Sequence, residues 1–406
     1  MVSWSFSLLA AAHSYNICDV TNKNAAVIAT AGVTGILLLA TMPFAADLRR
    51  EASVVPPDPA VHVIVDTDAG ADDLMAIAFL LSRGDVRVEA ITVVNGVAHV
   101  KPGAQNILRL LALAGHSEIP VYAGRERPLT GSAEFPAAWR EAADTLPGVT
   151  LPRAAGALQS EPAAQFLAKR FADTLHSVRA HRVRGQRVRL LALGPLTNIA
   201  SALDLTATPP KGVSEMVVMG GAIGVPGNLS DGGPPPNGNT TAEWNMFVDP
   251  VAAARVFGGS WNAAASTSVK KVPAPEIRLV PLDATNQVPI DSAFLARIER
   301  EARTPLARFV AQVLGTNRSL IAQRAYFAWD PLAAVALVHP EILRTRCLAI
   351  GVAREAHDAG RIIELQGELH GELPPQAPNA CVAVGADAQA FYRIFLGALE
   401  TGTPPR

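Results

Sequence analysis

Short apolar runs alternate with segments of helical periodicity throughout the chain after residue 60. The apolar runs are rich in β-branched and aliphatic residues and have the length of buried strands, at 61–67, 86–94, 121–122, 188–193, 214–221, 342–352 and 362–368. Helical segments follow or separate them, at 72–83, around 102–114, from near 162, after 197 and from 387. Strands that alternate with helices predict an α/β fold with a mostly parallel central sheet and helices on both faces.

The N-terminal fifty residues have a different pattern. Residues 25–46 are 22 uncharged, mostly apolar residues, which is enough to span a hydrocarbon core of about 30 Å as a helix. Two glycines and several β-branched residues disfavour a buried helix, and no clear signal-peptide cleavage site is visible. We expect a signal peptide or membrane anchor, and hence a periplasmic, secreted or membrane-anchored protein. The alternative is a misassigned start codon and a cytoplasmic protein.

The rest of the chain divides simply. We expect residues 1–24 to be an N-terminal extension, 47–60 a proline-containing linker and 61–406 one domain. Within that domain, residues 224–245 are the segment richest in glycine, proline and asparagine. Structureless segments of this length usually carry function, so we expect a functional loop between a strand and a helix.

Composition excludes some classes of protein. The chain has 35 basic and 36 acidic side chains, a balance that argues against a phosphate-neutralising nucleic-acid surface. Its three cysteines, Cys18, Cys347 and Cys381, are too few for a framework of several disulfides or for a four-cysteine zinc site. We interpret them as small apolar residues.

Four aspartates follow the first predicted strand: Asp66, Asp68, Asp72 and Asp73. Carboxylates this close repel one another unless a cation or protons intervene, and oxygen ligands favour calcium or magnesium. Helix capping would explain one or two of them, but not four. An EF-hand loop would need glutamate where Ile77 stands, and a phosphatase of the haloacid dehalogenase type is a distant alternative.

The segment VIVDTDAGADDLMAIAFLL resembles the N-terminal signature of the nucleoside hydrolase family, calcium-dependent enzymes with a Rossmann-like α/β fold that cleave the N-glycosidic bond of ribonucleosides. Further family motifs follow in the family's order. They are ITVVNG (91–96), LALGPLTNIASAL (191–203), MGGA (219–222), TAEWNMFVDPVAAARVF (241–257), VPLDATNQVP (280–289) and YFAWDPLAAVAL (326–337). The resemblance makes 61–406 a catalytic domain.

The resemblance implies a calcium site and a general base. Asp68, Asp73, the carbonyl of Thr197 and Asp330 would hold Ca²⁺. Asp68 would also take a proton from the water that the cation activates. Asp72 would accept a hydrogen bond from the ribose 2′-hydroxyl.

The remaining sugar contacts would come from amide and carboxylate side chains. The resemblance implies that Glu243, Asn245 and Asn228 hold the 5′- and 3′-hydroxyls, with a contribution from Asn95. Nearby carboxylates would stabilise an oxocarbenium-like transition state.

This chain differs from one branch of the family at the residue expected to protonate the leaving base. That branch has a histidine immediately before the last calcium ligand, and here the position is Trp329. The departure favours the purine-specific branch, in which two tryptophans sandwich the purine and this stacking activates the leaving base by making its ring nitrogen N7 easier to protonate from solvent. We expect Trp139 to be the second, with Phe135 on the same helix face, and Tyr326 to line the same pocket. Both tryptophans could instead be core residues, and among the histidines only His99 is a candidate acid.

We therefore expect a purine ribonucleoside hydrolase that uses Ca²⁺ and binds no nucleic acid. The alternative is a non-catalytic nucleoside- or sugar-binding protein with the same fold. The resemblance further implies a homodimer or homotetramer, and residues 25–46 leave membrane association open.

Overall fold

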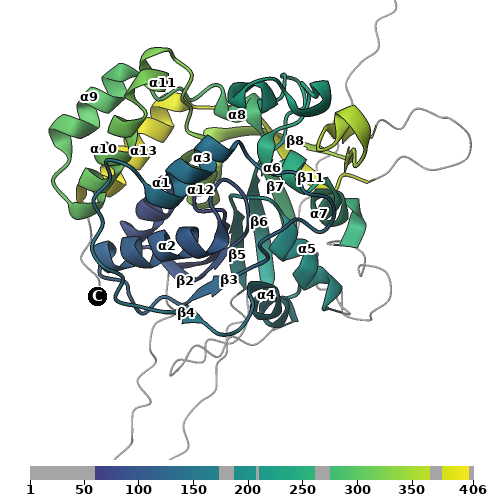
Figure 1. The fold of residues 1–406 in the computed structure, drawn as a ribbon, viewed down its shortest axis with the longest axis horizontal. Helices are drawn as coiled ribbons and strands as arrows, with labels where there is room; N and C mark the ends of the chain where they lie inside the picture. The colour runs from purple at the N-terminus through teal and green to yellow at the C-terminus, as the bar shows by residue number, and fades with distance from the viewer. Residues whose placement is uncertain (1–59, 173–186, 207–209, 261–274, 366–376, 402–406) are drawn as a thin grey trace, which may run out of the picture. The chain divides into compact units, whose positions relative to one another are not determined.

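A computed structural model of the protein describes residues 60–172, 187–206, 210–260, 275–365 and 377–401, all within the unit Pro56–Arg406. Within these ranges, nine strands form one sheet in the order β4-β3-β2-β1-β5-β6-β7-β11-β8 (Figure 1). The strands are β1 (Val61–Thr67), β2 (Val86–Val93), β3 (Val121–Ala123), β4 (Leu158–Gln159), β5 (Val188–Ala192), β6 (Val213–Met219), β7 (Glu276–Val280), β8 (Leu343–Leu348) and β11 (Ala380–Ala386). A separate antiparallel pair comprises β9 (Ile350–Val352) and β10 (Ile362–Glu364).

Neighbouring strands of the large sheet are parallel, except for the pair β8 and β11 at one edge. The predicted α/β fold with a mostly parallel sheet is therefore confirmed.

Alternate residues of the central strands enter different cores. In β1, Val63 and Val65 belong to one apolar cluster, whereas Ile64 between them belongs to another. Likewise in β6, Val217 faces the first cluster and Met216 the second. Because both faces of a parallel sheet are covered, the apolar residues of these strands occupy consecutive positions, as in Val63–Val65 and Met216–Met219, rather than every second one.

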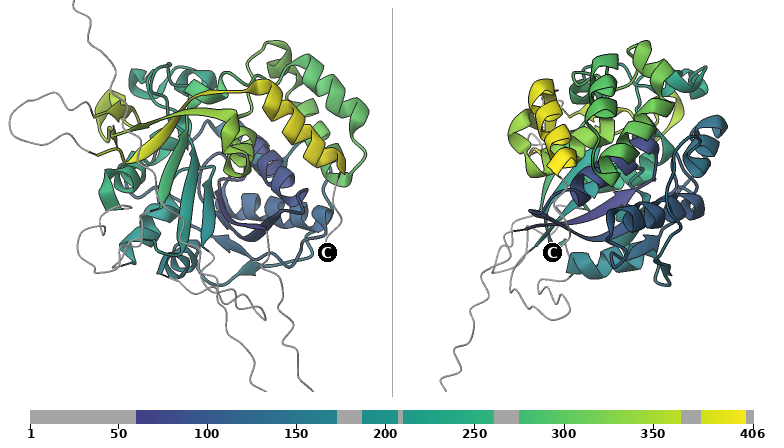
Figure 2. Two further views of the ribbon diagram at one scale, coloured as in Figure 1. Left: turned by 180° about the vertical axis from the view of Figure 1, so that it is seen from behind. Right: turned by 90° about the vertical axis from the view of Figure 1, so that its left-hand side faces the viewer.

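Helices cover both faces of the sheet (Figures 1 and 2). Those with residues in the first core are α1 (Ala71–Leu81), α2 (Val100–Ala114), α3 (Ala137–Thr145), α8 (Leu282–Thr285), α9 (Ser292–Glu301), α10 (Pro305–Thr316), α11 (Arg318–Ala322), α12 (Trp329–Val338) and α13 (Ala388–Thr401). Those in the second core are α4 (Ala163–Ala172), α5 (Thr197–Asp204), α6 (Trp244–Val248) and α7 (Pro250–Arg255). The segment between β6 and α6 is a long loop, as predicted, with two short 3₁₀ turns at Leu229–Gly232 and Pro236–Gly238.

The strand order reverses between β1 and β5. From β1 the chain proceeds outward through β2, β3 and β4, whereas from β5 it proceeds in the opposite direction through β6 and β7. The connections leaving β1 and β5 therefore diverge, and a crevice forms at the carboxyl ends of these two strands. The aspartate-rich segment leaves β1 at this point.

The interpretation of the cysteines as small apolar residues is wrong for two of them. Cys347 in β8 and Cys381 in β11 are paired across the antiparallel strands and form a disulfide, with their Cα atoms 3.8 Å apart. Residues far apart in sequence become direct neighbours in the sheet, which neither segment reveals alone. Cys18 lies outside the described residues.

The predicted N-terminal extension, apolar segment and linker at 1–24, 25–46 and 47–60 also lie outside the described residues, apart from Ala60. Within the part of the chain that the structure describes, no helix has the length and apolar character that a membrane crossing requires.

Candidate active site

Most of the predicted site residues meet in one pocket at the crevice between β1 and β5. Polar lining residues come from the start of α1, the start of α12 and the loop that precedes α6. The complete lining is Asp68, Asp72, Asp73, Val97, Phe135, Trp139, Leu193, Met219, Asn228, Asp231, Glu243, Trp244, Asn245, Trp329 and Asp330.

The turn between β1 and α1 is held by its own side chains. The Thr67 hydroxyl accepts a hydrogen bond from the backbone N–H of Ala69 at 3.0 Å and donates one to Asp73. Asp73 in turn accepts from the backbone N–H of Gly70 at 3.0 Å, so it caps the helix that carries it. Ala69 adopts a left-handed φ of 59°, a costly conformation for a residue with a Cβ. The surrounding contacts thus determine a strained turn that presents the aspartates to the pocket.

The side chain of Asp68 is held in place by the two loops that follow the neighbouring strands β2 and β5. Its carboxylate accepts a hydrogen bond from the backbone N–H of Val97 at 2.8 Å, and its side chain is 2% exposed. Glycines stand on both sides: a Cβ at Gly96 would lie 2.0 Å from Asp68 Oδ2, and one at Gly194 would lie 2.9 Å from Asp68 Cβ. Only residues without a side chain permit this close approach.

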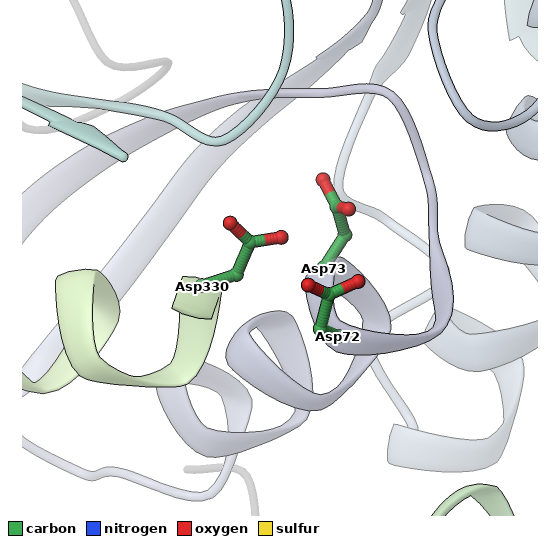
Figure 3. Close-up of side chains that lie close together, drawn as sticks. All are labelled: Asp72, Asp73 and Asp330. Carbon is green, nitrogen blue, oxygen red and sulfur yellow. The ribbon is translucent and has the colours of Figure 1, made fainter. Parts of the chain in front are cut away.

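Three carboxylates converge beside Asp68. Asp72 and Asp73 extend from the first turn of α1 and Asp330 from the first turn of α12, toward a common space (Figure 3). Each offers one oxygen, and these oxygens all lie within 4.8 Å of one another. The helices α1 and α12 pack against each other, which brings residues 257 positions apart into one cluster.

Burial raises the pKa of these groups. It raises the pKa of Asp72 to about 7 and that of Asp68 and Asp330 well above the ordinary value, and the neighbouring charge of Asp73 adds to each shift. The pKa of Asp73 is also raised by burial, although hydrogen bonds to Asp330 and Asp68 oppose the shift. Carboxyl groups this close must share protons or be neutralised by a cation. Their oxygen-only chemistry fits a hard divalent ion.

Two residues near the cluster stay outside the pocket lining. Thr197, the first residue of α5, is 1% exposed, and its hydroxyl donates to Asp249 at 2.6 Å. Asp66 lies behind the pocket, where it accepts hydrogen bonds from Thr92 and Asn198, and burial raises its pKa to about 7.

The loop before α6 supplies the predicted hydroxyl-binding side. Glu243 accepts hydrogen bonds from the backbone N–H groups of Asn245, Gly221 and Met246 at 2.9, 3.0 and 3.3 Å. Asn245 donates from Nδ2 to the Leu193 carbonyl at 2.9 Å, which connects α6 to the end of β5. These contacts fix two polar side chains at the pocket wall.

Asn228 lies on the same side of the pocket. Its Oδ1 accepts from the backbone N–H of Trp244 at 3.1 Å. The structure therefore brings Asn228, Glu243 and Asn245 together, as predicted.

An aromatic wall closes one side of the pocket. Trp244 stacks on Phe135 with ring centroids 5.0 Å apart and meets Trp139 edge-on at 5.8 Å. The prediction that Phe135 and Trp139 share a helix face is wrong, because α3 begins at Ala137, after Pro136, and Phe135 precedes the helix. Both rings nevertheless line the pocket. Trp244 was not predicted, although it lies between Glu243 and Asn245 in the AEWN motif.

Trp329 lines the pocket from the start of α12. It packs edge-on against Tyr326 and Phe327, with centroid distances of 5.1 and 6.0 Å. Tyr326 is 4% exposed and packs against Trp329, and it is not among the residues that line the pocket.

Asn95 also stays outside the lining. It is 3% exposed, and its Oδ1 accepts a hydrogen bond from Arg140 at 2.7 Å. The residue of this segment that does reach the pocket is Val97. The candidate acid His99 lies outside the lining too: it is exposed and pairs with Asp144 at 2.6 Å.

The sequence and the structure are similar to those of known nucleoside hydrolases. The sequence profile described as inosine-uridine preferring nucleoside hydrolase matches residues 63–393. Pyrimidine-specific ribonucleoside hydrolase RihA of Shewanella baltica is 30% identical over 362 residues, which cover 84% of this chain and 97% of the relative. Probable uridine nucleosidase 1 of Oryza sativa subsp. japonica is 29% identical over 309 residues, 75% of this chain and 85% of the relative.

Solved structures agree. A plant nucleoside hydrolase superposes with a TM-score of 0.68 at 25% identity, covering 84% of this chain and 99% of the other. A purine-preferring ribonucleoside hydrolase from Gardnerella vaginalis has the same fold, with a TM-score of 0.65 at 24% identity over 84% and 98% of the two chains.

The fold and the matched sequence define an N-glycosyl hydrolase that acts on ribonucleosides. The chain belongs to the inosine-uridine preferring nucleoside hydrolase family. The resemblance inferred from the sequence motifs is thereby confirmed.

Proposed function

We propose that the protein is a calcium-dependent purine ribonucleoside hydrolase that releases free base and ribose. The observation that supports this most directly is the composition of the pocket. The same pocket is lined by a cluster of carboxylates and by tryptophan side chains.

Asp68, Asp73 and Asp330, with the carbonyl of Thr197, are the proposed calcium ligands, and Asp72 lies within reach as a further oxygen donor. The fit is supported by the oxygen-only donor set and by the raised pKa values of the carboxyl groups. When bound, the cation would neutralise the carboxylates and make a nearby water more acidic.

Asp68 is proposed as the general base that removes a proton from the attacking water. Its immobilisation between Gly96 and Gly194 supports this role, because a base must be held within hydrogen-bond reach of the proton it accepts. Asp72 is proposed to accept a hydrogen bond from the ribose 2′-hydroxyl.

Glu243, Asn245 and Asn228 are proposed to bind the other ribose hydroxyls. Glu243 and Asn245 are 3% and 6% exposed, so their orientation is restricted before substrate binds. The nearby carboxylates would stabilise positive charge that develops on the sugar.

The preference for purines is supported by the aromatic residues. Trp139 and Trp329 line the same pocket from α3 and from the start of α12, and a flat base between them would stack on both. Two relatives are described as acting on uridine or pyrimidine ribonucleosides, and a structural neighbour as purine-preferring. Separate assays with purine and pyrimidine nucleosides therefore distinguish the two preferences.

The assay is ribose release by the purified chain with calcium, using inosine, adenosine, guanosine and uridine separately. We expect higher kcat/KM for the purine nucleosides and loss of activity in the Asp68→Asn variant, which retains the size of the side chain. Faster cleavage of uridine would overturn the purine preference alone. Nucleoside binding without ribose release would instead support the non-catalytic alternative.

We also propose that residues 25–46 export or anchor the protein, that 61–406 form its catalytic domain and that it assembles as a homodimer or homotetramer. Export is supported by the Cys347–Cys381 disulfide, since disulfides persist mainly in oxidising compartments. Cell fractionation and light scattering of the purified protein test location and assembly.

A further inference from the structure

One carboxylate of the pocket lies apart from the aspartate cluster. Asp231 belongs to the 3₁₀ turn Leu229–Gly232, in the long loop before α6, and lines the pocket. Its backbone N–H donates to the carbonyl of Asn228 at 3.0 Å. Asn228 also accepts from the backbone N–H of Trp244 and donates its own N–H to the carbonyl of Ala242, so the turn is attached to the segment before α6 at two points.

The packing of Gly232 locates this turn beside the aromatic residues. A Cβ on Gly232 would lie 2.4 Å from Pro136 Cγ and 3.3 Å from the Trp244 ring. Pro136 separates Phe135 from α3, the helix that carries Trp139. Asp231 is therefore next to a residue that packs against the aromatic wall. Asp72, Asp73 and Asp330, by contrast, lie at the start of α1 and α12.

The other carboxyl groups of the pocket are already engaged. Asp68, Asp73 and Asp330 are hydrogen-bonded among themselves, and Glu243 accepts three backbone hydrogen bonds. Asp72 accepts backbone hydrogen bonds within its own helical turn, and its proposed partner is the ribose 2′-hydroxyl. Among the described residues, by contrast, we find no hydrogen bond or ion pair to the carboxylate of Asp231. No histidine is among the residues that line the pocket.

We propose that Asp231 is the general acid that protonates the leaving base. The proposal rests on the proposed nucleoside hydrolase function. As the bond between C1′ and the base nitrogen breaks, its electron pair stays on the base, and the Asp231 carboxyl proton moves to a ring nitrogen such as N7 of a purine. The water oxygen bonds to C1′ and its proton moves to Asp68. Asp231 is exposed to solvent, so the resulting carboxylate regains a proton from water.

The surroundings suit this role. Partial burial raises the pKa of Asp231 above its ordinary value, which increases the protonated fraction near neutral pH. On the neighbouring helix α3, Arg140 is occupied by other partners, since it pairs with Glu134 and donates to Asn95. The remaining titratable groups that line the pocket are the aspartates of the cluster and Glu243.

The test compares two substrates in the full-length protein with calcium. Inosine requires protonation of its leaving base, whereas p-nitrophenyl riboside releases a stable anion and does not. We expect Asp231→Asn to lower kcat for inosine about 10²- to 10⁴-fold, the usual contribution of a general acid, with KM changed little. Hydrolysis of p-nitrophenyl riboside should stay near the wild-type rate.

A matched control is Ser230→Ala, which changes the exposed neighbouring side chain and should leave both rates unchanged. The wild-type rate on inosine should fall as the pH rises through the pKa of Asp231, and the residual rate of Asp231→Asn should lack this limb. Equal loss on both substrates, or loss on neither, would overturn the role of Asp231. A wild-type protein that cleaves neither substrate would overturn the proposed function itself.

Discussion

Gly96 lies so close to the carboxylate of Asp68 that a Cβ on residue 96 would be 2.0 Å from Oδ2. The same segment binds that carboxylate through the backbone N–H of Val97 at 2.8 Å. The position of the proposed general base thus depends on the absence of a side chain at the end of the neighbouring strand. Because Asp68 also contacts Asp73, a displacement at this point would spread into the carboxylate cluster.

Gly96→Ala tests this dependence. The added methyl group must displace Asp68, so we expect ribose release to fall at least about 10²-fold, the scale on which removal of a general base acts. Gly397→Ala in α13 is the control, because a Cβ there has no neighbour within 4 Å, and it should keep full activity. Full activity in Gly96→Ala would contradict the immobilised position of Asp68.

Trp329→Ala tests the aromatic side of the pocket. An aromatic pair contributes about 0.5–1.5 kcal/mol beyond its buried area, so we expect kcat/KM for inosine to fall by about 2- to 12-fold or more. Calcium affinity, measured by calorimetry, should change much less, because the indole supplies no oxygen ligand. Unchanged turnover with calcium retained would contradict stacking of the base on Trp329.

Removal of divalent ions should make stability depend on pH. Burial raises the pKa of Asp66 and Asp72 to about 7, above the value of about 3.9 in an unfolded chain. A folded-state pKa above the unfolded one favours the folded protein at low pH, and this contribution is lost as the pH rises from about 4 to 7. We therefore expect the Tm of the metal-free protein to fall between pH 5 and pH 8.

Calcium should reverse this trend by neutralising the ionised carboxylates. The increase in Tm on calcium addition, measured by scanning calorimetry, should be larger at pH 8 than at pH 5. A calcium-induced shift that is larger at pH 5 would be inconsistent with the proposed ligands.

The Cys347–Cys381 disulfide should stabilise the sheet edge without contributing to the reaction. It closes a loop between residues 34 positions apart, and disulfides of this kind contribute about 2–4 kcal/mol to the free energy of unfolding. A double Cys347→Ala, Cys381→Ala variant should lose stability on that scale in urea denaturation while keeping kcat. Thiol titration of the unreduced, denatured chain should detect no thiol from residues 347 or 381, and labelling of either would refute the disulfide.

The central strands could be predicted because they are buried on both faces. β1 has the predicted bounds, Val61–Thr67, and β2, β5 and β6 differ from theirs by one or two residues. β7 was not predicted because Glu276 and Arg278 interrupt its apolar pattern. β11 consists largely of alanine, glycine and valine, and its place between β7 and β8 comes from pairing with strands distant in the sequence.

Local sequence also explains which site residues were predictable. Asp68, Asp72 and Asp73 lie close together in the segment between β1 and α1. Asp330 lies within the motif YFAWDPLAAVAL (326–337). Asp231 and Trp244 enter the pocket only because the loop before α6 folds against Pro136, a contact between segments about 100 residues apart that no local pattern indicates. The position of Asn95 outside the pocket lining was equally hidden from local sequence, since its partner Arg140 comes from α3.

We propose that the carboxylate cluster holds the divalent cation on which hydrolysis of ribonucleosides depends. The most direct measurement is ribose release from inosine by the full-length protein, first after removal of divalent ions and then after addition of calcium. We expect negligible release without the ion, recovery on calcium addition and no recovery in an Asp330→Asn variant. Full ribose release from the metal-free protein would contradict this proposal.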